Sequence, residues 1–490
     1  MPKLINNKKI LFFFVTLLGV ITSFSLLPNG HFLINFITLN IFFILLNKCE
    51  YIKNKIDYFI FGWLFGFGYF LSSLYWITIS LTFDPNLKIL IPLALILIPG
   101  FLAIFFAAPT LLLFFFKDLS KLNLILIFSL LFGISEFLRG TILTGFPWNL
   151  FVFSFSNYIS FLQSLSFLGT YGLNLICITF FLIPLILFFK KNNFEMLIAT
   201  FLSITFILFF FLGNYNLNDT KKSQVLINND FKIRVLSSKI EINRFYNINS
   251  EKEIINNLIN LGKSNSSSPI IYIWPEGILT SSFLKDIHKY KELFRKNFKK
   301  NDLIILGIND INYDHNVKIF NSLAVMDYEL NVISVYHKNK LVPFGEFLPF
   351  EKVLSKIGLK KITNNYQSFS KGLERDSFRI KNLNILPLIC YEIIYSGRLS
   401  KNNSYDLIVN ISEDGWFGKS IGPYQHFIHS IFRAIEEGKN IIRSSNNGVT
   451  AVINSKGEII KSNESTKSGV IEISYLEKPY KNTFFSKYRT

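Results

Sequence analysis

The sequence predicts a protein of two parts, a polytopic α-helical membrane domain followed by a layered α/β domain. Half of the 490 residues are hydrophobic and 17% are aromatic, which is more apolar than an ordinary soluble chain. The long Leu, Ile and Phe runs lie almost entirely before residue 214, whereas charged residues, Asn and turn formers dominate after it. We therefore predict a transmembrane domain at 1–213, a linker at 214–230, an α/β domain at 231–476 and a tail at 477–490.

Seven apolar runs in the first part are candidates to cross about 30 Å of hydrocarbon, which takes roughly 20 helical residues. They are residues 10–27, 31–47, 58–81, 89–116, 122–138, 171–189 and 194–213. The first run follows three lysines as a signal peptide would, but it lacks a small-x-small cleavage site, and another run follows at once. We interpret it as an uncleaved helix.

The loops between these runs differ in charge on the two sides of the membrane. The loops on one side hold Lys3, Lys8, Lys9, Lys48, Lys53, Lys55, Lys117, Lys121, Lys190 and Lys191; the other side has Lys88 and Arg139. Because Lys and Arg concentrate in cytoplasmic loops, the amino terminus is predicted to be cytoplasmic and the α/β domain to lie on the outer face.

Two polar or small-residue patterns occur within the membrane half. Glu136 and Arg139 stand at i,i+3 spacing before a Gly-Phe-Pro-Trp turn, and we interpret them as an ion pair beside an interfacial Trp148. Gly62 and Gly66 have the spacing that allows close helix packing. Both patterns favour a structural role.

Charge and cysteine content exclude several classes of function. The formal net charge is +18, but the lysines are scattered rather than gathered in a block, so nucleic-acid binding is not indicated. Three cysteines, Cys49, Cys177 and Cys390, form no disulfide framework and no Cys/His metal pattern. With no phosphate-binding loop or ligand cluster, we expect no metal and no other cofactor.

Three titratable residues follow apolar strands in the second part. Glu276 ends "PIIYIWPEG", Lys338 ends "VISVYHK" and Cys390 follows "LNILPLI". Strands alternating with helical segments predict an α/β layered fold, in which functional residues gather at the carboxyl ends of strands. A thiol needs a base, which a buried carboxylate supplies, and an ammonium stabilises an oxyanion. Together the three residues are suited to acyl transfer.

Each of the three also has an inert interpretation. A single cysteine in an apolar strand is more often part of the core, by about two to one from burial statistics. Glu276 after Trp-Pro fits a turn, and Lys338 beside Lys340 fits a solvated surface. Taken singly, each inert interpretation is favoured.

Longer motifs favour the functional interpretation. "WPEG", "YHKNKLVPFGEFLP", "ICYEIIY" and "NISEDGWFG" resemble, in order and spacing, the nitrilase-like domain of the bacterial apolipoprotein N-acyltransferases. "GWLFGFGYFLSSLYW" and "EFLRGTILTGFPWN" in the membrane half are similar to that family's signatures. The resemblance covers nearly the whole chain and implies an αββα sandwich with a Glu-Lys-Cys triad.

Carried onto the matching positions, the resemblance implies Glu276 as general base, Lys338 as oxyanion-stabilising cation and Cys390 as nucleophile. Glu346 matches a further acid that orients the lysine or assists proton transfer. Additional positions are implied to support the nucleophile or contact substrate. These are Tyr391 and Glu392 beside the nucleophile and Trp416 near a substrate entrance. Separately, the apolar segment "LVPFGEFLPF" is suited to the membrane interface, and its Phe344, Phe347 and Phe350 are candidates to contact an acyl chain.

The resemblance also implies a reaction and a location. The acyl donor would be a membrane phospholipid, and the acceptor the α-amino group of the S-diacylglyceryl cysteine that begins an apolipoprotein. The enzyme would form a thioester and work from the outer, periplasmic side of a bacterial inner membrane. No nucleotide or metal would be required, because the phospholipid ester supplies the acyl energy.

Three departures from the family pattern are visible. The family usually has a last transmembrane helix after the enzymatic domain, whereas no apolar span precedes the final "TFFSKYRT". Glu413 stands where Asn is common, and "VLSS" in the first strand lacks the usual Asn-x-x-Gln. We expect these changes to affect anchoring and pocket details rather than the triad.

Two rival functions use the same observations. A membrane-tethered nitrilase-type amidohydrolase would pass the acyl group to water instead of an amine. A transporter or binding module with an inactive outer domain would predict paired charges deep within the spans and a degenerate triad. The mostly uncharged spans and the complete triad argue against the second rival.

Overall fold

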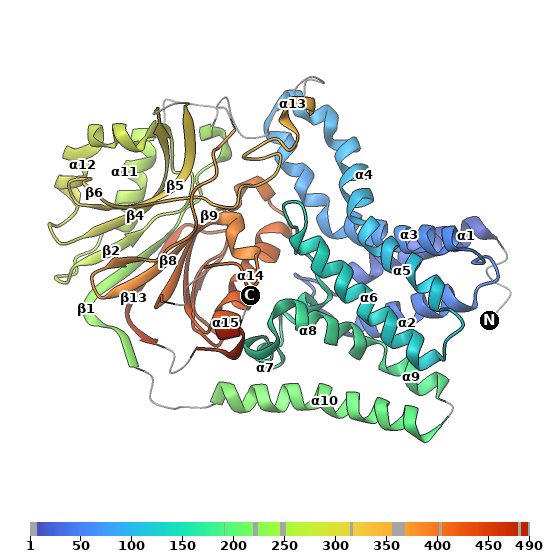
Figure 1. Cartoon of the computed structure of the whole chain (residues 1–490). Coiled ribbons are helices and arrows are strands. Elements are labelled where there is room, and N and C mark those ends of the chain that lie inside the picture. The colour runs from blue at the N-terminus through green and yellow to red at the C-terminus, as the bar shows by residue number, and fades with distance from the viewer. Residues whose placement is uncertain are drawn as a thin grey trace. The chain divides into compact units, whose positions relative to one another are not determined.

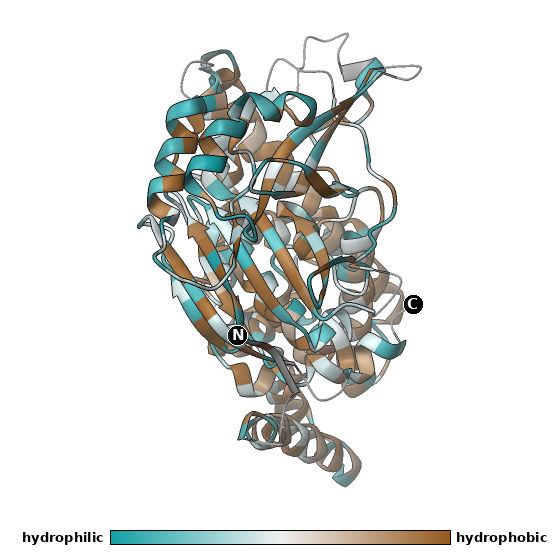
Figure 2. Cartoon of the chain, turned by 90° about the vertical axis from the view of Figure 1, so that its left-hand side faces the viewer, coloured by the Kyte–Doolittle hydropathy of each residue, from teal (hydrophilic) through white to brown (hydrophobic). Residues whose placement is uncertain are grey.

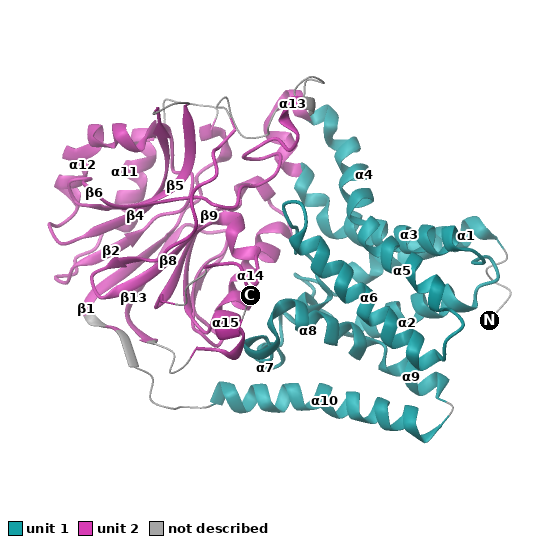
Figure 3. Ribbon diagram, viewed as in Figure 1, with its two compact units in different colours: residues 1–78, 88–219 teal, residues 79–87, 220–490 magenta. Residues whose placement is uncertain are grey.

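A computed structural model describes residues 7–190, 192–218, 224–245, 251–313, 317–354, 368–400, 404–478 and 482–488. The chain divides into a helical unit, residues 1–78 with 88–219, and an α/β unit, residues 79–87 with 220–490 (Figure 3). Lys3 and Lys191 of the predicted charge asymmetry, and parts of the predicted linker and tail, lie outside the described residues.

The helical unit consists of apolar helices joined by short turns (Figure 1). They are α1 (Lys8–Ser23), α2 (Leu33–Lys48), α3 (Lys55–Leu74), η1 (Tyr75–Phe83), η2 (Pro85–Leu90), α4 (Ile91–Leu102), α5 (Ile104–Leu113), η3 (Phe114–Phe116), α6 (Lys121–Thr141), η4 (Phe151–Phe155), α7 (Ile159–Leu162), α8 (Leu165–Phe181), α9 (Ile183–Phe189) and α10 (Asn193–Asn218).

Five helical segments within the described residues are long and apolar enough to span a membrane. They are Lys55–Phe83, Pro85–Phe116, Lys121–Thr141, Leu165–Phe189 and Asn193–Asn218. The predicted runs at 10–27 and 31–47 form α1 and α2, of 16 residues each. All seven predicted runs are therefore largely helical, and the protein is a multi-pass membrane protein.

The predicted run at 89–116 is divided between α4 and α5. Pro99 and Pro109 lie inside these helices. A proline removes one backbone hydrogen bond and crowds the preceding turn, which bends or breaks a helix. Hydropathy alone does not register this break, because the flanking residues are equally apolar.

Glu136 and Arg139 on α6 form the ion pair that their spacing predicts. Arg139 Nη2 lies 3.3 Å from Glu136 Oε1, and neither side chain is exposed. Arg139 Nη1 also donates to the carbonyls of Phe146 and Trp148, both at 2.7 Å. Asn174 on α8 donates to Glu136 Oε2 at 2.5 Å. The bonds of Arg139 to the two carbonyls hold the turn after α6. Because both charged side chains are buried, loss of either one leaves the other charge unpaired.

We therefore expect Arg139→Met to lower the stability of the protein by about 3 kcal/mol, the lower end for a broken buried ion pair. Thermal unfolding in detergent measures the change, with Lys121→Met at the start of the same helix as the matched control. Equal unfolding temperatures for the two variants would contradict the role given to the cluster.

The α/β unit consists of strands that alternate with short helices, as the pattern after residue 231 predicts. The strands are β1 (Gln224–Ser237), β2 (Ile270–Ile273), β3 (Leu279–Phe283), β4 (Leu303–Asn312), β5 (Lys318–Asp327), β6 (Val332–His337), β7 (Phe378–Ile380), β8 (Leu383–Ile389), β9 (Leu407–Glu413), β10 (Asn440–Asn446), β11 (Thr450–Ile453), β12 (Ile459–Asn463) and β13 (Gly469–Lys478). The helices are η5 (Ile242–Phe245), α11 (Glu251–Gly262), η7 (Leu284–Tyr290), α12 (Lys291–Asn297), α13 (Glu351–Leu354), η9 (Cys390–Ile394), η10 (Asp414–Phe417), α14 (Gly422–Glu437) and α15 (Phe484–Tyr488).

The strands form two sheets. One has the order β13-β1-β2-β4-β5-β6 with β3 beside β4, and the other the order β12-β11-β10-β9-β8-β7. A buried cluster that includes Ile271, Ile305, Ile389 and Val409 takes members from both sheets. Strands are accordingly among the most hydrophobic segments of the view in Figure 2.

Helices cover the outer faces of the two sheets. The amphipathic α11 and α12 bury Ile255, Leu258 and Phe294 in a second cluster on the first sheet, and α14 packs on β10 and β11 of the second. The order helix, sheet, sheet, helix confirms the predicted αββα sandwich.

Strand direction decides which ends meet at one edge. β2 and β4 run parallel, β4 and β5 antiparallel, and β5 and β6 antiparallel, so β6 points the same way as β2. The carboxyl ends of β2 and β6 and the amino end of β5 therefore lie on one edge of the first sheet.

Candidate active site

The predicted Glu276 and Lys338 meet at this edge. Glu276 follows β2 by three residues, and Lys338 follows β6 directly. Lys338 Nζ lies 3.4 Å from Glu276 Oε1 and 3.0 Å from Glu346 Oε1. The lysine is 1% exposed, and a buried ammonium is tolerated only when it is paired. Glu346 is thus the second partner of the lysine, in the loop after β6.

Asn321 bridges the two carboxylates, and its role was not predicted from the sequence. Its Nδ2 donates to Glu276 Oε1 at 2.8 Å and to Glu346 Oε1 at 2.6 Å. Its carbonyl accepts from the Lys338 N–H at 2.8 Å. Asn321 lies near the amino end of β5, so a search of carboxyl ends passes over it. A polar side chain among the apolar residues of this strand was the available signal.

Cys390 occupies a sharp turn at the end of β8. Its φ is +49°, although most non-glycine residues avoid the left-handed region. The strand ends at Ile389 and the 3₁₀-helix η9 begins at Cys390. The turn leaves Cys390 9% exposed at the end of a buried strand. Backbone strain of this kind persists only where surrounding contacts hold it.

Glu392 supplies those contacts. Its Oε2 accepts from the Ile389 N–H at 2.9 Å, just before the turn. Its Oε1 accepts from the N–H groups of Asn339 and Lys340, at 2.9 and 3.0 Å, and from the Tyr336 hydroxyl at 2.7 Å. One buried carboxylate therefore ties the Cys390 turn to the residues on both sides of Lys338.

Glu276 faces both the thiol and the second sheet. Its Oε2 accepts from the N–H of Glu413, the last residue of β9, at 3.0 Å, and the Cys390 thiol is near enough to influence the pKa of its carboxyl. A Cβ on Gly307 of β4 would lie 2.8 Å from the Glu276 Cα. Only glycine at 307 allows the Glu276 backbone to approach the sheet this closely.

Burial and charge set the protonation of these groups. Burial, with the nearby Glu276 charge, raises the pKa of the Cys390 thiol above its ordinary value, while Lys338 opposes the rise. Burial likewise raises the pKa of Glu276, against the effect of Lys338. Burial alone would lower the pKa of Lys338, but Glu276 and Glu346 raise it. The resting site holds a charged lysine, a protonated thiol and a carboxyl suited to accept its proton.

Asp414, His426 and Arg443 form a buried network behind Cys390 that the sequence did not reveal. His426 Nδ1 and Arg443 Nη2 each lie 2.8 Å from an Asp414 oxygen, and His426 Nε2 lies 3.3 Å from the Cys390 carbonyl. Cys390, Asp414 and His426 also place possible metal-donor atoms within 4.8 Å of one another. Because Arg443, His426 and Ser412 occupy both Asp414 oxygens, the carboxylate is already compensated by hydrogen bonds.

The remaining predicted residues differ in their exposure and aromatic contacts. Tyr391 is 8% exposed and packs edge-on against Tyr395, with ring centroids 5.5 Å apart. Trp416 is half-buried and lies 5.1 Å from Phe245, centroid to centroid. Phe344 is 48% exposed, whereas Phe347 is half-buried.

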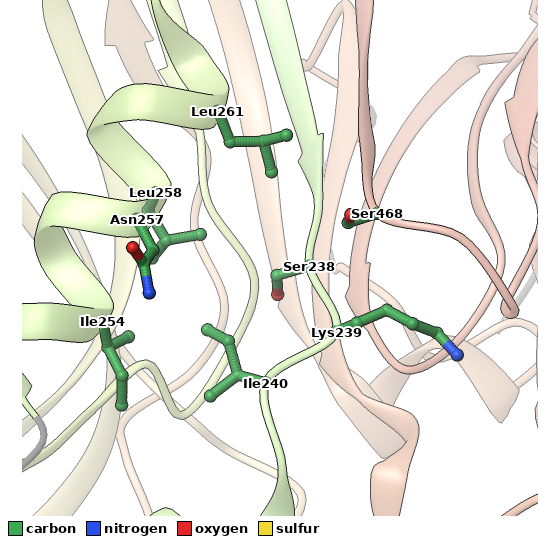
Figure 4. A pocket seen from close by; sticks show the side chains of 8 residues that line it. All are labelled: Ser238, Lys239, Ile240, Ile254, Asn257, Leu258, Leu261 and Ser468. Carbon is green, nitrogen blue, oxygen red and sulfur yellow. The ribbon is translucent and has the colours of Figure 1, made fainter.

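A hollow of about 310 Å³ lies elsewhere in the α/β unit, between α11 and the end of β1 (Figure 4). Its lining residues are Ser238, Lys239, Ile240, Ile254, Asn257, Leu258, Leu261 and Ser468. None of the predicted site residues belongs to this set, so it is distinct from the Glu-Lys-Cys centre.

Comparison with known families agrees with the fold. Residues 271–474 match the carbon-nitrogen hydrolase family, and residues 18–183 match the apolipoprotein N-acyltransferase N-terminal domain. The apolipoprotein N-acyltransferase of Rickettsia prowazekii is 34% identical over 85% of this chain and 82% of its own length. That of Rhodopseudomonas palustris is 30% identical over 87% and 81%.

Fold and centre thus define a carbon-nitrogen hydrolase domain attached to membrane helices. Both halves match in one chain, and the relatives align along most of their length. The chain belongs to the apolipoprotein N-acyltransferase family, which confirms the resemblance seen in the motifs.

The raised pKa of Glu276 has a consequence for stability. The folded chain binds this proton more tightly than the unfolded chain, so the associated stability is present below the ordinary carboxyl value of 4.5 and is lost as pH rises through the folded pKa. A glutamine at this position does not titrate, so Glu276→Gln does not lose stability in this way as the pH rises. We therefore expect the unfolding temperature of the variant minus that of the unchanged protein to increase between pH 4.5 and pH 8.

Thermal unfolding across this pH range measures the difference. Glu253→Gln, at an exposed position on α11, is the matched control and should follow the unchanged protein at every pH. A Glu276→Gln curve parallel to that of the unchanged protein would mean that Glu276 titrates normally.

Proposed function

We propose that this protein transfers an acyl chain from a membrane phospholipid to the α-amino group of the S-diacylglyceryl cysteine at the start of apolipoproteins. The observation that carries the proposal is the buried Lys338 between Glu276 and Glu346, beside the strained Cys390. The relatives' shared name supports the acceptor class. Acyl transfer needs these parts and no redox or phosphoryl chemistry.

In the first half-reaction, the Cys390 sulfur attacks the sn-1 ester carbonyl of the phospholipid. Glu276 takes the thiol proton, and the oxyanion is stabilised by Lys338 Nζ and the Tyr391 N–H. The C–O bond to glycerol then breaks, and the proton passes from Glu276 to the departing oxygen. The products are a thioester on Cys390 and a lysophospholipid.

In the second half-reaction, the neutral α-amino group attacks the thioester carbonyl. Glu276 takes a proton from the nitrogen as the C–N bond forms. The C–S bond breaks, and the proton returns to the Cys390 sulfur. The product is an amide, the free enzyme is regenerated, and the two steps together give ping-pong kinetics.

Several features support a bacterial inner membrane, with this chemistry on the periplasmic side. The apolar helices embed the protein, and the lysine asymmetry of the loops favours a cytoplasmic amino terminus. Phe344 and Phe350 are 48% and 79% exposed in one loop after Lys338. Such aromatics suit contact with a lipid interface, and with Phe347 they are candidates to receive the acyl chain. Trp416 is the candidate for the entrance.

Incubation with phospholipid should add one acyl chain to the protein. Intact-mass measurement is expected to show an adduct that hydroxylamine removes, because a thioester is labile to it. Cys390→Ala should abolish the adduct, whereas Cys49→Ala, at a half-buried cysteine of the helical unit, should retain it. An adduct that persists in Cys390→Ala would overturn the assignment of the nucleophile.

A second measurement separates acyl transfer from hydrolysis. Adding a diacylglyceryl-cysteine peptide with a free amino terminus should discharge the thioester into an amide on that peptide. The same peptide with an acetylated amino terminus is the matched control and should leave the thioester in place. Release of free fatty acid at equal rates with both peptides would favour a membrane-tethered amidohydrolase instead.

A further inference from the structure

A buried ion pair contacts Glu276 and the main chain next to it. Arg244 of η5 and Glu413 at the end of β9 pair through Nη2 and Oε2, with side chains 2% and 3% exposed. Arg244 Nε donates to the Gly277 carbonyl at 2.9 Å, and Nη1 donates to the carbonyls of Glu241 and Ile240, at 2.9 and 3.3 Å. The guanidinium thus holds the Gly277–Ile278 peptide, one residue beyond Glu276.

Glu413 is equally well held, and it touches Glu276 through its backbone. Its Oε1 accepts from the Gly415 N–H at 2.8 Å, and its Oε2 accepts from Asn446 Nδ2 at 2.7 Å. Its own N–H donates to Glu276 Oε2 at 3.0 Å. One ion pair therefore fixes both the main chain beyond Glu276 and the donor that orients its second oxygen.

We propose that Arg244 and Glu413 are positioning residues for Glu276. Their charges compensate each other, so removal of either one leaves the other buried without its partner. This inference rests on the proposed role of Glu276 as the general base. The pair gives the Glu276 carboxyl one backbone donor, the Glu413 N–H, and the opposite charges of Arg244 and Glu413 add no net charge beside it.

The charges around Glu276 explain why compensation matters. Its charged or titratable neighbours are Lys338, directly after β6, Glu346, in the following loop, and Cys390, at the start of η9. Loss of Arg244 would add an unpaired carboxylate at Glu413, which disfavours ionisation of Glu276; loss of the Glu413 charge would add an unpaired cation, which favours it. The two single changes should act in opposite directions and cancel when combined.

The test follows the first turnover of acyl-enzyme formation against pH. Because the acid limb of such a profile reports ionisation of the base, Arg244→Met should move it to higher pH and slow acylation at neutral pH at least about ten-fold. Glu413→Gln should move the limb to lower pH. The double variant should return it close to the position in the unchanged protein, with a rate within a few-fold.

A matched ion pair controls for the loss of a salt bridge as such. Arg234 and Glu472 pair on β1 and β13, away from the site. Arg234→Met with Glu472→Gln should leave the profile unchanged. If Arg244→Met does not fold, Glu413→Gln and the double variant carry the test, since they predict a downward shift and its reversal.

The outcomes distinguish this inference from the proposed function. If the unchanged protein forms no adduct on Cys390, the proposed function fails. If the adduct forms but the acid limb stays in place in the single variants, or the double variant does not cancel their shifts, the positioning pair is wrong while the function stands.

Discussion

The buried ammonium of Lys338 is the constraint on which the site depends. A charge that is 1% exposed is destabilising unless counter-charges and hydrogen bonds surround it. Glu276 and Glu346 provide the charges, and Asn321 bridges their oxygens. These groups reach the lysine only because β2, β5 and β6 bring their ends to one edge of one sheet. The sheet order that buries the core therefore also assembles the charged centre.

The second sheet contributes the nucleophile through a different device. Cys390 stands in a left-handed turn, and Glu392 accepts hydrogen bonds from both that turn and the loop around Lys338. The Glu392 carboxylate thus joins elements of the two sheets as a hydrogen-bonding hub. The same residue therefore holds both the strained turn at Cys390 and the loop that carries the buried Lys338. A movement of one is expected to disturb the other.

Two positions that stood out in the sequence, the "VLSS" stretch and Glu413, lie in one hydrogen-bond network. Ser238 donates to Asn446 Oδ1 at 2.7 Å, and Asn446 Nδ2 donates to Glu413 Oε2 at 2.7 Å. Arg244 balances the charge that Glu413 adds. Two segments that are far apart in the sequence are thus neighbours in the structure. The network reaches Glu276 through the Glu413 N–H, which donates to Glu276 Oε2.

The sequence by itself determined the division into membrane helices and a layered α/β domain, because hydropathy and strand periodicity are local properties. Its motifs also singled out Glu276, Lys338, Glu346 and Cys390, since each lies after an apolar strand or within a long motif. Tertiary structure alone placed Asn321 and Arg244. Asn321 lies near the amino end of β5 and reaches the site through antiparallel pairing. Arg244 reaches it through a buried pair with a residue 169 positions away. Contacts of that kind depend on how strands are ordered in space, which local pattern does not encode.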